Sequence, residues 1–178
     1  MFVGRETELK TLEELYRRDS WQMVVIYGRR RVGKTTLIAK FLEGRPAIFF
    51  VAQEAGDRMN LEVFTRKIFE YFRVPDSLGG FSTWNDAFDF LAERAERERF
   101  VLVIDEFPYA AEGNRGLKSI LQNVIDRRLK NTKTFLMLCG SQIGFMENEV
   151  LGHKSPLFGR RTAQMKIEGF DYVDASRM

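Results

Sequence analysis

The residues from Gly28 to Thr35 form the motif in this sequence that most clearly predicts chemistry. They read GRRRVGKT and match the pattern G-x-x-x-x-G-K-[ST] in full. The two glycines let the backbone turn tightly and bring its N–H groups close to an anion, with no Cβ in the way. Lys34 offers a positive charge to β- and γ-phosphates, and the Thr35 hydroxyl is a ligand for Mg²⁺. The spacing therefore predicts a P-loop that binds a nucleoside triphosphate, ATP or a close analogue, together with Mg²⁺.

We expect the whole loop and the next residue to contact the nucleotide. These residues are Gly28, Arg29, Arg30, Arg31, Val32, Gly33, Lys34, Thr35 and Thr36. The three arginines occupy the variable positions of the motif. They either add long-range attraction for a polyphosphate or are simply solvated at the loop tip.

An acidic pair follows a second apolar run. Residues 101–106 read VLVIDE, about 70 residues after the P-loop. A buried strand that ends in carboxylates presents them at the sheet edge where α/β proteins bind ligands. Asp105 is then placed to hold Mg²⁺, and Glu106 to orient or deprotonate an attacking water. This is the Walker B pattern, and it favours hydrolysis over phosphoryl transfer to a small molecule.

Two later segments complete the predicted catalytic set. The run FLMLCGSQ, residues 135–142, would place Ser141 or Gln142 near the γ-phosphate, although it also fits a plain strand end. The run SPLFGRRT, residues 155–162, contains Arg160 and Arg161. Either arginine could stabilise transition-state charge, in cis or from a neighbouring subunit, or the two could be a surface pair. The candidate catalytic residues are Lys34, Glu106, Ser141, Arg160 and Arg161.

Strand-like and helix-like segments alternate around these motifs. Short apolar runs at 23–27, 47–52, 100–104 and 134–139 predict buried strands, and 162–167 is a weaker candidate. Apolar residues at helical spacing predict helices over 6–18, 34–42, 61–72, 84–97 and 117–129. Alternation of this kind implies parallel strands with right-handed crossovers. The expected fold is therefore a three-layer α/β sandwich.

Composition and charge limit the remaining possibilities. With 178 residues, 44% of them hydrophobic and 30% charged, the chain suits one globular domain rather than a disordered segment. The net charge of +3 permits contact with nucleic acid without arguing for it. One cysteine, Cys139, excludes an intrachain disulfide, and we see no signal peptide and no apolar run of membrane-spanning length. We expect a cytoplasmic protein without a membrane partner.

With these motifs in place, the sequence resembles the archaeal-type ATPases of the STAND group, relatives of the AAA+ and origin-recognition ATPases. The resemblance rests on five segments in order: Phe2 to Glu6 (FVGRE), Gly28 to Thr35, Leu102 to Phe107 with its DEF motif, Leu138 to Gln142, and Ser155 to Arg161 (SPLFGRR). These segments cover nearly the whole chain. As a set they are more specific than any one of them alone.

The resemblance implies several properties that the residues alone do not. It implies a five-stranded parallel sheet in the order 5-1-4-3-2, and a preference for adenine, with Val3, Gly4 and Arg5 near the base. It also implies a helical or winged-helix region after the ATPase core. Residues 1–178 would then be the core alone, as part of a longer protein or as a minimal form. A DNA or protein partner, bound through further domains, and oligomerisation stay open.

Three functions are compatible with these residues. The first is an ATPase that works as a switch or motor module, which binds ATP and releases ADP. The second is a nucleotide-gated module for binding DNA or protein, with little turnover. The third is a small-molecule kinase, which the Asp-Glu pair disfavours. The chain contains no Asn-Lys-x-Asp guanine motif, which also favours adenine.

Overall fold

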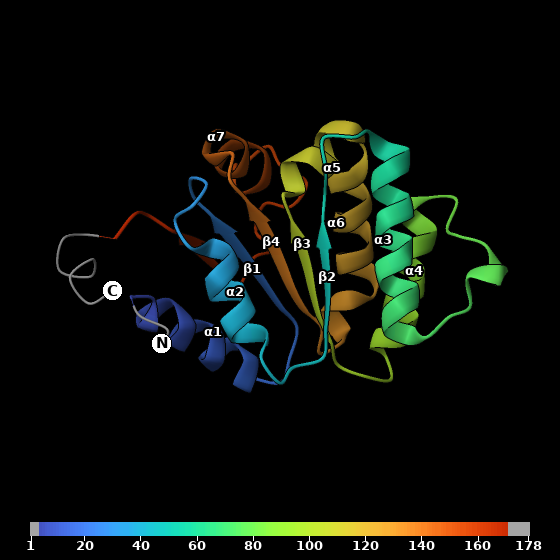
Figure 1. The fold of residues 1–178 in the computed structure, drawn as a ribbon, viewed down its shortest axis with the longest axis horizontal. Helices are drawn as coiled ribbons and strands as arrows, with labels where there is room; N and C mark the ends of the chain where they lie inside the picture. The colour runs from blue at the N-terminus through green and yellow to red at the C-terminus, as the bar shows by residue number, and fades with distance from the viewer. Residues whose placement is uncertain (1–3, 171–178) are drawn as a thin grey trace.

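Five parallel strands form one sheet in this computed structural model, which describes residues 4–170 (Figure 1). The strands are β1 (Gln22–Tyr27), β2 (Ala47–Val51), β3 (Val101–Asp105), β4 (Phe135–Gly140) and β5 (Ala163–Lys166). Their order across the sheet is β2-β3-β4-β1-β5, and each pairing is parallel. Read from the other edge, this is the predicted order 5-1-4-3-2. The predicted fold class is confirmed.

Helices cover both faces of the sheet (Figure 1). One face carries α1 (Glu6–Arg17) and α2 (Lys34–Leu42). The other carries α3 (Asp57–Phe72), α4 (Trp84–Ala95), α5 (Phe107–Gly113), α6 (Leu117–Arg127) and the short α7 (Ile143–Phe145). Alternate residues of β1 pack on opposite sides, so that Val24 and Ile26 contact the first layer and Val25 the second. These are the three predicted layers.

Some elements differ from the prediction. The helix predicted over 61–72 begins four residues earlier, at Asp57. The Asp57 carboxylate accepts a hydrogen bond from Trp84 Nε1 at 2.7 Å, and its charge suits a helix N-terminus. Helix α5 and the π-helical turn at Met146–Val150 were not predicted, because each is too short to show a helical period.

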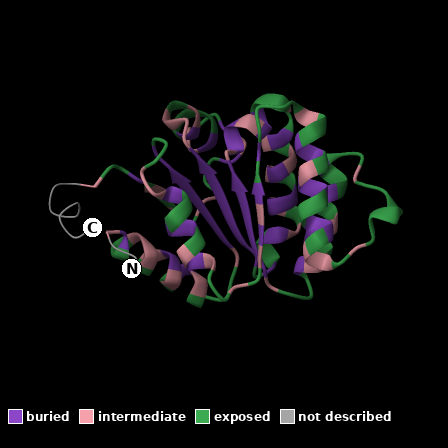
Figure 2. Cartoon of the chain, viewed as in Figure 1, coloured by how far each residue is buried: buried purple, intermediate pink, exposed green. Residues whose placement is uncertain are grey.

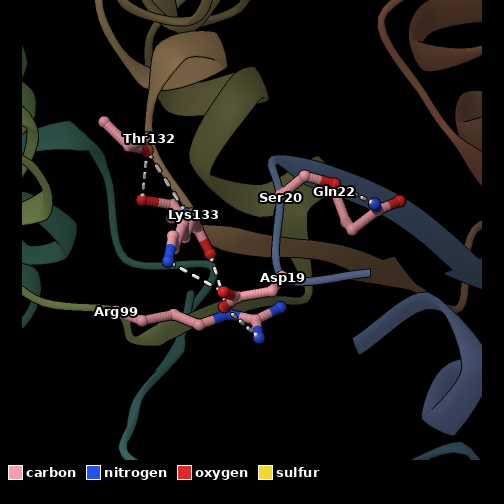
Figure 3. Close-up of polar contacts among 7 residues, drawn as sticks. Asp19, Ser20, Gln22, Arg99, Thr132 and Lys133 are labelled. Carbon is pink, nitrogen blue, oxygen red and sulfur yellow. Dashed lines mark hydrogen bonds and ion pairs between the residues drawn. The ribbon is translucent and has the colours of Figure 1, made fainter. Parts of the chain in front are cut away.

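The amino ends of three strands are tied together by one carboxylate (Figure 3). Asp19, just before β1, accepts hydrogen bonds from Lys133 Nζ at 2.7 Å and from Arg99 Nη1 at 3.3 Å. Arg99 precedes β3 and Lys133 precedes β4. The hydrogen bond from Lys133 lowers the pKa of Asp19. Ion pairs connect the strands at this end of the sheet, and the predicted site residues lie at the opposite end.

The central strands are buried along their whole length (Figure 2). The parallel register aligns their carboxyl ends, pairing Tyr27 with Gly140 and Val51 with Asp105. The polar segments that follow β1, β3 and β4 therefore meet at one edge of the sheet. Within residues 4–170, none of the helices has both the length and the apolar character needed to cross a bilayer.

Candidate functional site

The P-loop turn depends on its two glycines. A Cβ on Gly28 would lie 2.1 Å from the carbonyl oxygen of Ile167, so the segment after β5 leaves room for glycine only. Gly33 has a φ of 96°, a left-handed conformation that precedes the first turn of α2. The Gly28 N–H also donates to the carbonyl of Gly140 at 3.3 Å. The loop is thus held between the ends of β4 and β5.

Lys34 closes this loop from inside. Lys34 is only 8% exposed, and its Nζ donates to the carbonyl oxygens of Gly28 at 2.6 Å and Arg29 at 2.7 Å. Burial lowers the pKa of Lys34, and the charges of Glu106 and Asp105 oppose that shift. The ammonium group therefore lies within electrostatic reach of both carboxylates.

The acidic pair continues from the end of β3 into α5. Asp105 is 9% exposed, and its Oδ1 accepts a hydrogen bond from the Glu106 N–H at 2.8 Å. Burial raises the pKa of Asp105 despite that bond and the nearby Lys34. Glu106 has a φ of 50°, which is unusual for a residue with a side chain. Left-handed residues of this kind cluster at functional sites.

The P-loop and the acidic pair line one cavity of about 370 Å³. Its lining residues are Arg30, Arg31, Gly33, Lys34, Thr35, Thr36, Asp105 and Glu106. Its volume lies within the usual range for small-ligand sites. The structure thus brings together the two motifs that the sequence placed about 70 residues apart.

Ser141 contacts Glu106, the second residue of the acidic pair. Its hydroxyl donates to the Glu106 carboxylate, at 3.3 Å from Oε1 and 3.2 Å from Oε2. Ser141 follows β4, the strand beside β3. The sequence predicts that Ser141 or Gln142 lies near the γ-phosphate, and that prediction stays open; the contact that Ser141 makes in this structure is with Glu106.

The N-terminal segment is joined to the P-loop through Arg5. Its Nη2 donates to the carbonyl of Val32 at 3.0 Å and to the carbonyl of Glu168, and its guanidinium lies 4.4 Å from the centre of the Phe170 ring. Gly4 packs closely against the same ring. Val3 lies outside the described residues. The N-terminal box thus connects the P-loop with the segment that follows β5.

A second cavity, of about 280 Å³, lies between the P-loop and the segment that follows β5. Its lining residues are Arg29, Val32, Ile143, Lys166, Ile167, Glu168 and Gly169. Arg29 and Val32 therefore line a different cavity from Arg30 and Arg31, although all four residues are neighbours in the same loop.

The two late arginines have different surroundings. Arg160 forms a two-point ion pair with Asp126 of α6, with Nε to Oδ1 at 3.2 Å and Nη2 to Oδ2 at 2.8 Å. This contact lowers the pKa of Asp126. Arg161 is half-buried, and among residues 4–170 it makes no hydrogen bond or ion pair. Arg161 also lies near Tyr27, the residue before the P-loop. Burial raises the pKa of Tyr27, and the positive charge of Arg161 opposes that rise.

Two tyrosines at this edge were missed by the sequence analysis. Tyr109 of α5 accepts a hydrogen bond from Arg30 Nη2 at 2.7 Å. The Tyr27 hydroxyl donates to Glu147 Oε2 at 3.2 Å, within the π-helical turn. The position of Tyr109, three residues after Glu106, was visible in the sequence. Its meaning depended on α5, which is too short to be predicted from periodicity.

Known structures share the fold of this chain. The Walker-type ATPase PABY2304 of Pyrococcus abyssi aligns with a TM-score of 0.74 and 22% identity, over 99% of this chain and 56% of that one. Cdc6p of Pyrobaculum aerophilum aligns with a TM-score of 0.65 and 17% identity, over 92% of this chain and 45% of that one. At these identities the likeness concerns the fold.

Sequence relatives extend the likeness. The uncharacterised protein MJECL04 of Methanocaldococcus jannaschii is 38% identical over 171 residues, 94% of this chain and 36% of that protein. The uncharacterised ATP-binding protein MJ0423 of the same organism is 51% identical over 45 residues, 25% of this chain and 76% of that protein. The chain spans about a third of the length of the first of these relatives.

A family model also matches almost the whole sequence. It describes an ATPase domain found predominantly in Archaea, and it matches residues 2–178. The match includes the P-loop, the acidic pair and the segment around Arg160. Nucleotide binding by an ATPase domain agrees with the cavity between Lys34 and Asp105. The chain belongs to this family of predominantly archaeal ATPase domains.

Proposed function

We propose that this chain binds ATP with Mg²⁺ and hydrolyses it to ADP and phosphate, as a switch or motor module of a larger protein. The observation that carries the proposal is the shared cavity, in which the Lys34 ammonium and the carboxylates of Asp105 and Glu106 line one space. One cation for phosphate and two carboxylates for metal and water are the groups that this hydrolysis requires.

Phosphate binding would exchange the partners of Lys34. Its ammonium now bonds to two backbone carbonyls, those of Gly28 and Arg29. Anionic phosphate oxygens are stronger acceptors than neutral carbonyls. The N-terminus of α2 adds the positive end of its dipole, together with N–H groups that have no partner within the helix.

The residues present fit a magnesium ion. Asp105 is a buried carboxylate whose pKa burial raises, so its charge lacks full compensation within the protein. A divalent cation would supply that compensation, held by the Asp105 carboxylate and the Thr35 hydroxyl. When bound, Mg²⁺ would offset the negative charge of the phosphates and orient them.

Hydrolysis then needs a base beside the γ-phosphate. The oxygen of a water molecule forms a bond to the γ-phosphorus, and its proton passes to the Glu106 carboxylate. The bond from that phosphorus to the β–γ bridging oxygen breaks, and ADP keeps the electron pair. The Ser141 hydroxyl, bonded to both Glu106 oxygens, would hold the carboxylate in position.

The direct test is phosphate release by the purified chain. We expect release of phosphate from ATP in the presence of Mg²⁺ and none after chelation by EDTA. ATP binding without release would favour the second candidate, a nucleotide-gated binding module. That candidate draws support from a fold neighbour, the Drosophila ORC in a structure bound to DNA.

Several finer assignments are part of the same proposal. Val3, Gly4 and Arg5 would lie near the adenine, which is supported by the contact of Arg5 with Val32 beside the second cavity. Four further points stay predictions: membership of the STAND group, a cytoplasmic location, a DNA or protein partner, and self-association. An affinity for ATP well above that for GTP would support the adenine assignment, and equal affinities would contradict it.

Asp105→Asn should separate metal binding from stability. The raised pKa means that the ionised Asp105 carboxylate lowers the stability of the folded protein at neutral pH, relative to the unfolded chain. Asparagine keeps an oxygen for the Glu106 N–H and carries no charge. We expect the nucleotide-free variant to melt about 2–4 °C higher, as a gain of about 1 kcal/mol would produce in a domain of this size.

The same variant should lose the dependence of ATP affinity on Mg²⁺. Calorimetric titrations with and without Mg²⁺ measure this, and differential scanning measures the melting temperature. Asp86→Asn, in the exposed first turn of α4, is the matched control and should keep the metal dependence. A variant that melts lower than the parent and still responds to Mg²⁺ would contradict the assignment.

Of the two late arginines, Arg161 is the better candidate for a catalytic contact. Arg160 is paired with Asp126, whereas Arg161 has no ionic partner within residues 4–170. We expect Arg161→Ala to lower kcat about 100-fold with little change in melting temperature. We expect Arg160→Ala mainly to lower the melting temperature, because it removes a two-point ion pair.

A contribution of Arg161 in trans would appear in the concentration dependence. The specific activity of the parent chain should then rise with protein concentration, and that of Arg161→Ala should stay flat. Equal kcat values for parent and variant at every concentration would remove Arg161 from the mechanism.

A further inference from the structure

The three consecutive arginines of the P-loop diverge. Arg30 and Arg31 line the cavity that contains Lys34 and Glu106, whereas Arg29 lines the cavity on the other side of the loop. Arg31 has a φ of 65°, so the backbone changes direction between Arg30 and Val32. Only Arg30 of the three has a side-chain hydrogen bond within residues 4–170, and its partner is on α5.

That partner places Arg30 at the acidic end of the cavity. Arg30 Nη2 donates to the Tyr109 hydroxyl at 2.7 Å. Tyr109 lies three residues after Glu106, the N-cap residue of α5, and its N–H donates to the Glu106 carbonyl at 3.0 Å, so both residues lie at the amino end of that helix. The charge of the Arg30 guanidinium adds to the effect of burial in lowering the pKa of Lys34. The two cations are therefore within electrostatic reach of each other.

The charge of Arg30 remains available in this position. Most arginines with a described partner in this chain, such as Arg160 with Asp126 or Arg45 with Glu13, are paired with a carboxylate. Tyr109 offers a neutral hydroxyl, which fixes the direction of the side chain without cancelling its charge. A guanidinium forms stronger hydrogen bonds with phosphate oxygens than with a phenol.

We propose that Arg30 is the arginine of this chain's own P-loop that contacts the γ-phosphate and stabilises the charge of the transition state, with Tyr109 as its positioning residue. The inference rests on the proposed ATP site. In the hydrolysis step, Arg30 donates hydrogen bonds to the γ-phosphoryl oxygens and transfers no proton. Because loop and cavity belong to one chain, this contribution acts in cis.

The first test compares ATP and ADP binding and needs no turnover. In a Glu106→Gln background, which is chosen to suppress hydrolysis, Arg30→Gln should weaken ATP binding about 10-fold or more and ADP binding less than about 3-fold. Arg29→Gln is the matched control, since it removes the same charge from the same loop on the other side. It should weaken both nucleotides by similar factors.

The second test measures turnover. Arg30→Gln alone should lower kcat about 100- to 1,000-fold, as the loss of one transition-state donor does. Arg30→Lys should restore part of kcat, and Tyr109→Phe, which keeps the ring, should lower kcat about 10-fold or less. These ratios should not change when the protein is diluted.

The outcomes separate this inference from the proposed function. Equal weakening of ATP and ADP by Arg30→Gln, or an unchanged kcat, would show that Arg30 only attracts polyphosphate, and the inference would be wrong. A parent chain that binds ATP without hydrolysing it would contradict the proposed hydrolysis, while the ratio of ATP to ADP affinity would still decide the contact with the γ-phosphate. A parent chain that binds neither nucleotide would overturn both.

Discussion

Lys34→Ala is expected to reduce ATP affinity about 100-fold or more, the largest effect of any single substitution on binding. The ammonium is the only buried cation of the P-loop, at 8% exposure, and it already faces the loop interior through Gly28 and Arg29. Removing one partner of a buried charge–charge contact costs several kcal/mol. Isothermal titration with ATP and Mg²⁺ measures the loss.

A control on the same helix tests whether the effect is local. Lys40 is on α2, its side chain is 41% exposed, and it pairs with Glu43 at 3.2 Å. Lys40→Ala removes the same charge six residues further along and should leave ATP affinity within about 2-fold, because exposed pairs contribute little. Unchanged ATP affinity in Lys34→Ala would contradict the assignment of the loop as the phosphate site.

Glu106→Gln is expected to lower kcat about 1,000-fold while ATP binding persists, because loss of a positioned general base costs 100- to 10,000-fold. Glutamine keeps the side-chain length and an oxygen for the Ser141 hydroxyl. It cannot accept the proton of the attacking water. Single-turnover phosphate release measures the rate, and titration with ATP measures the retained affinity.

The same helix supplies the comparison for this prediction. Glu112 is an exposed residue of α5, and Glu112→Gln should leave kcat within about 2-fold of the parent. A Glu106→Gln variant with the parent's kcat would remove the carboxylate from the proton transfer. Ser141→Ala should lie between the two, because it removes only the hydrogen bonds that hold Glu106.

Much of the fold could be predicted because it depends on local patterns. The strands β1, β3 and β4 are buried on both faces, so their apolar runs are continuous in the sequence. The P-loop was equally visible, because two glycines and a lysine at fixed spacing are needed for close approach to phosphate. Strand order came from the family resemblance, since apolar runs alone do not specify which strands are neighbours.

The rest depended on contacts between distant segments. The ion pair of Arg160 with Asp126 joins residues 34 apart, and nothing in the motif around Arg160 indicates it. The left-handed backbone of Glu106 reflects the junction of β3 with α5 rather than any preference of glutamate. The separation of Arg29 from Arg30 follows from the path of the P-loop, which lies between the carboxyl ends of β4 and β5. The spacing of residues in the motif does not encode that path.

A crystal structure of the chain with Mg²⁺ and the non-hydrolysable analogue AMP-PNP tests the central claim most directly. We predict three phosphates within the turn of residues 28–35, with Lys34 Nζ bonded to phosphate oxygens instead of to the carbonyls of Gly28 and Arg29. At saturating analogue, a turn that holds no phosphate, with Lys34 still bonded to those two carbonyls, would contradict the claim.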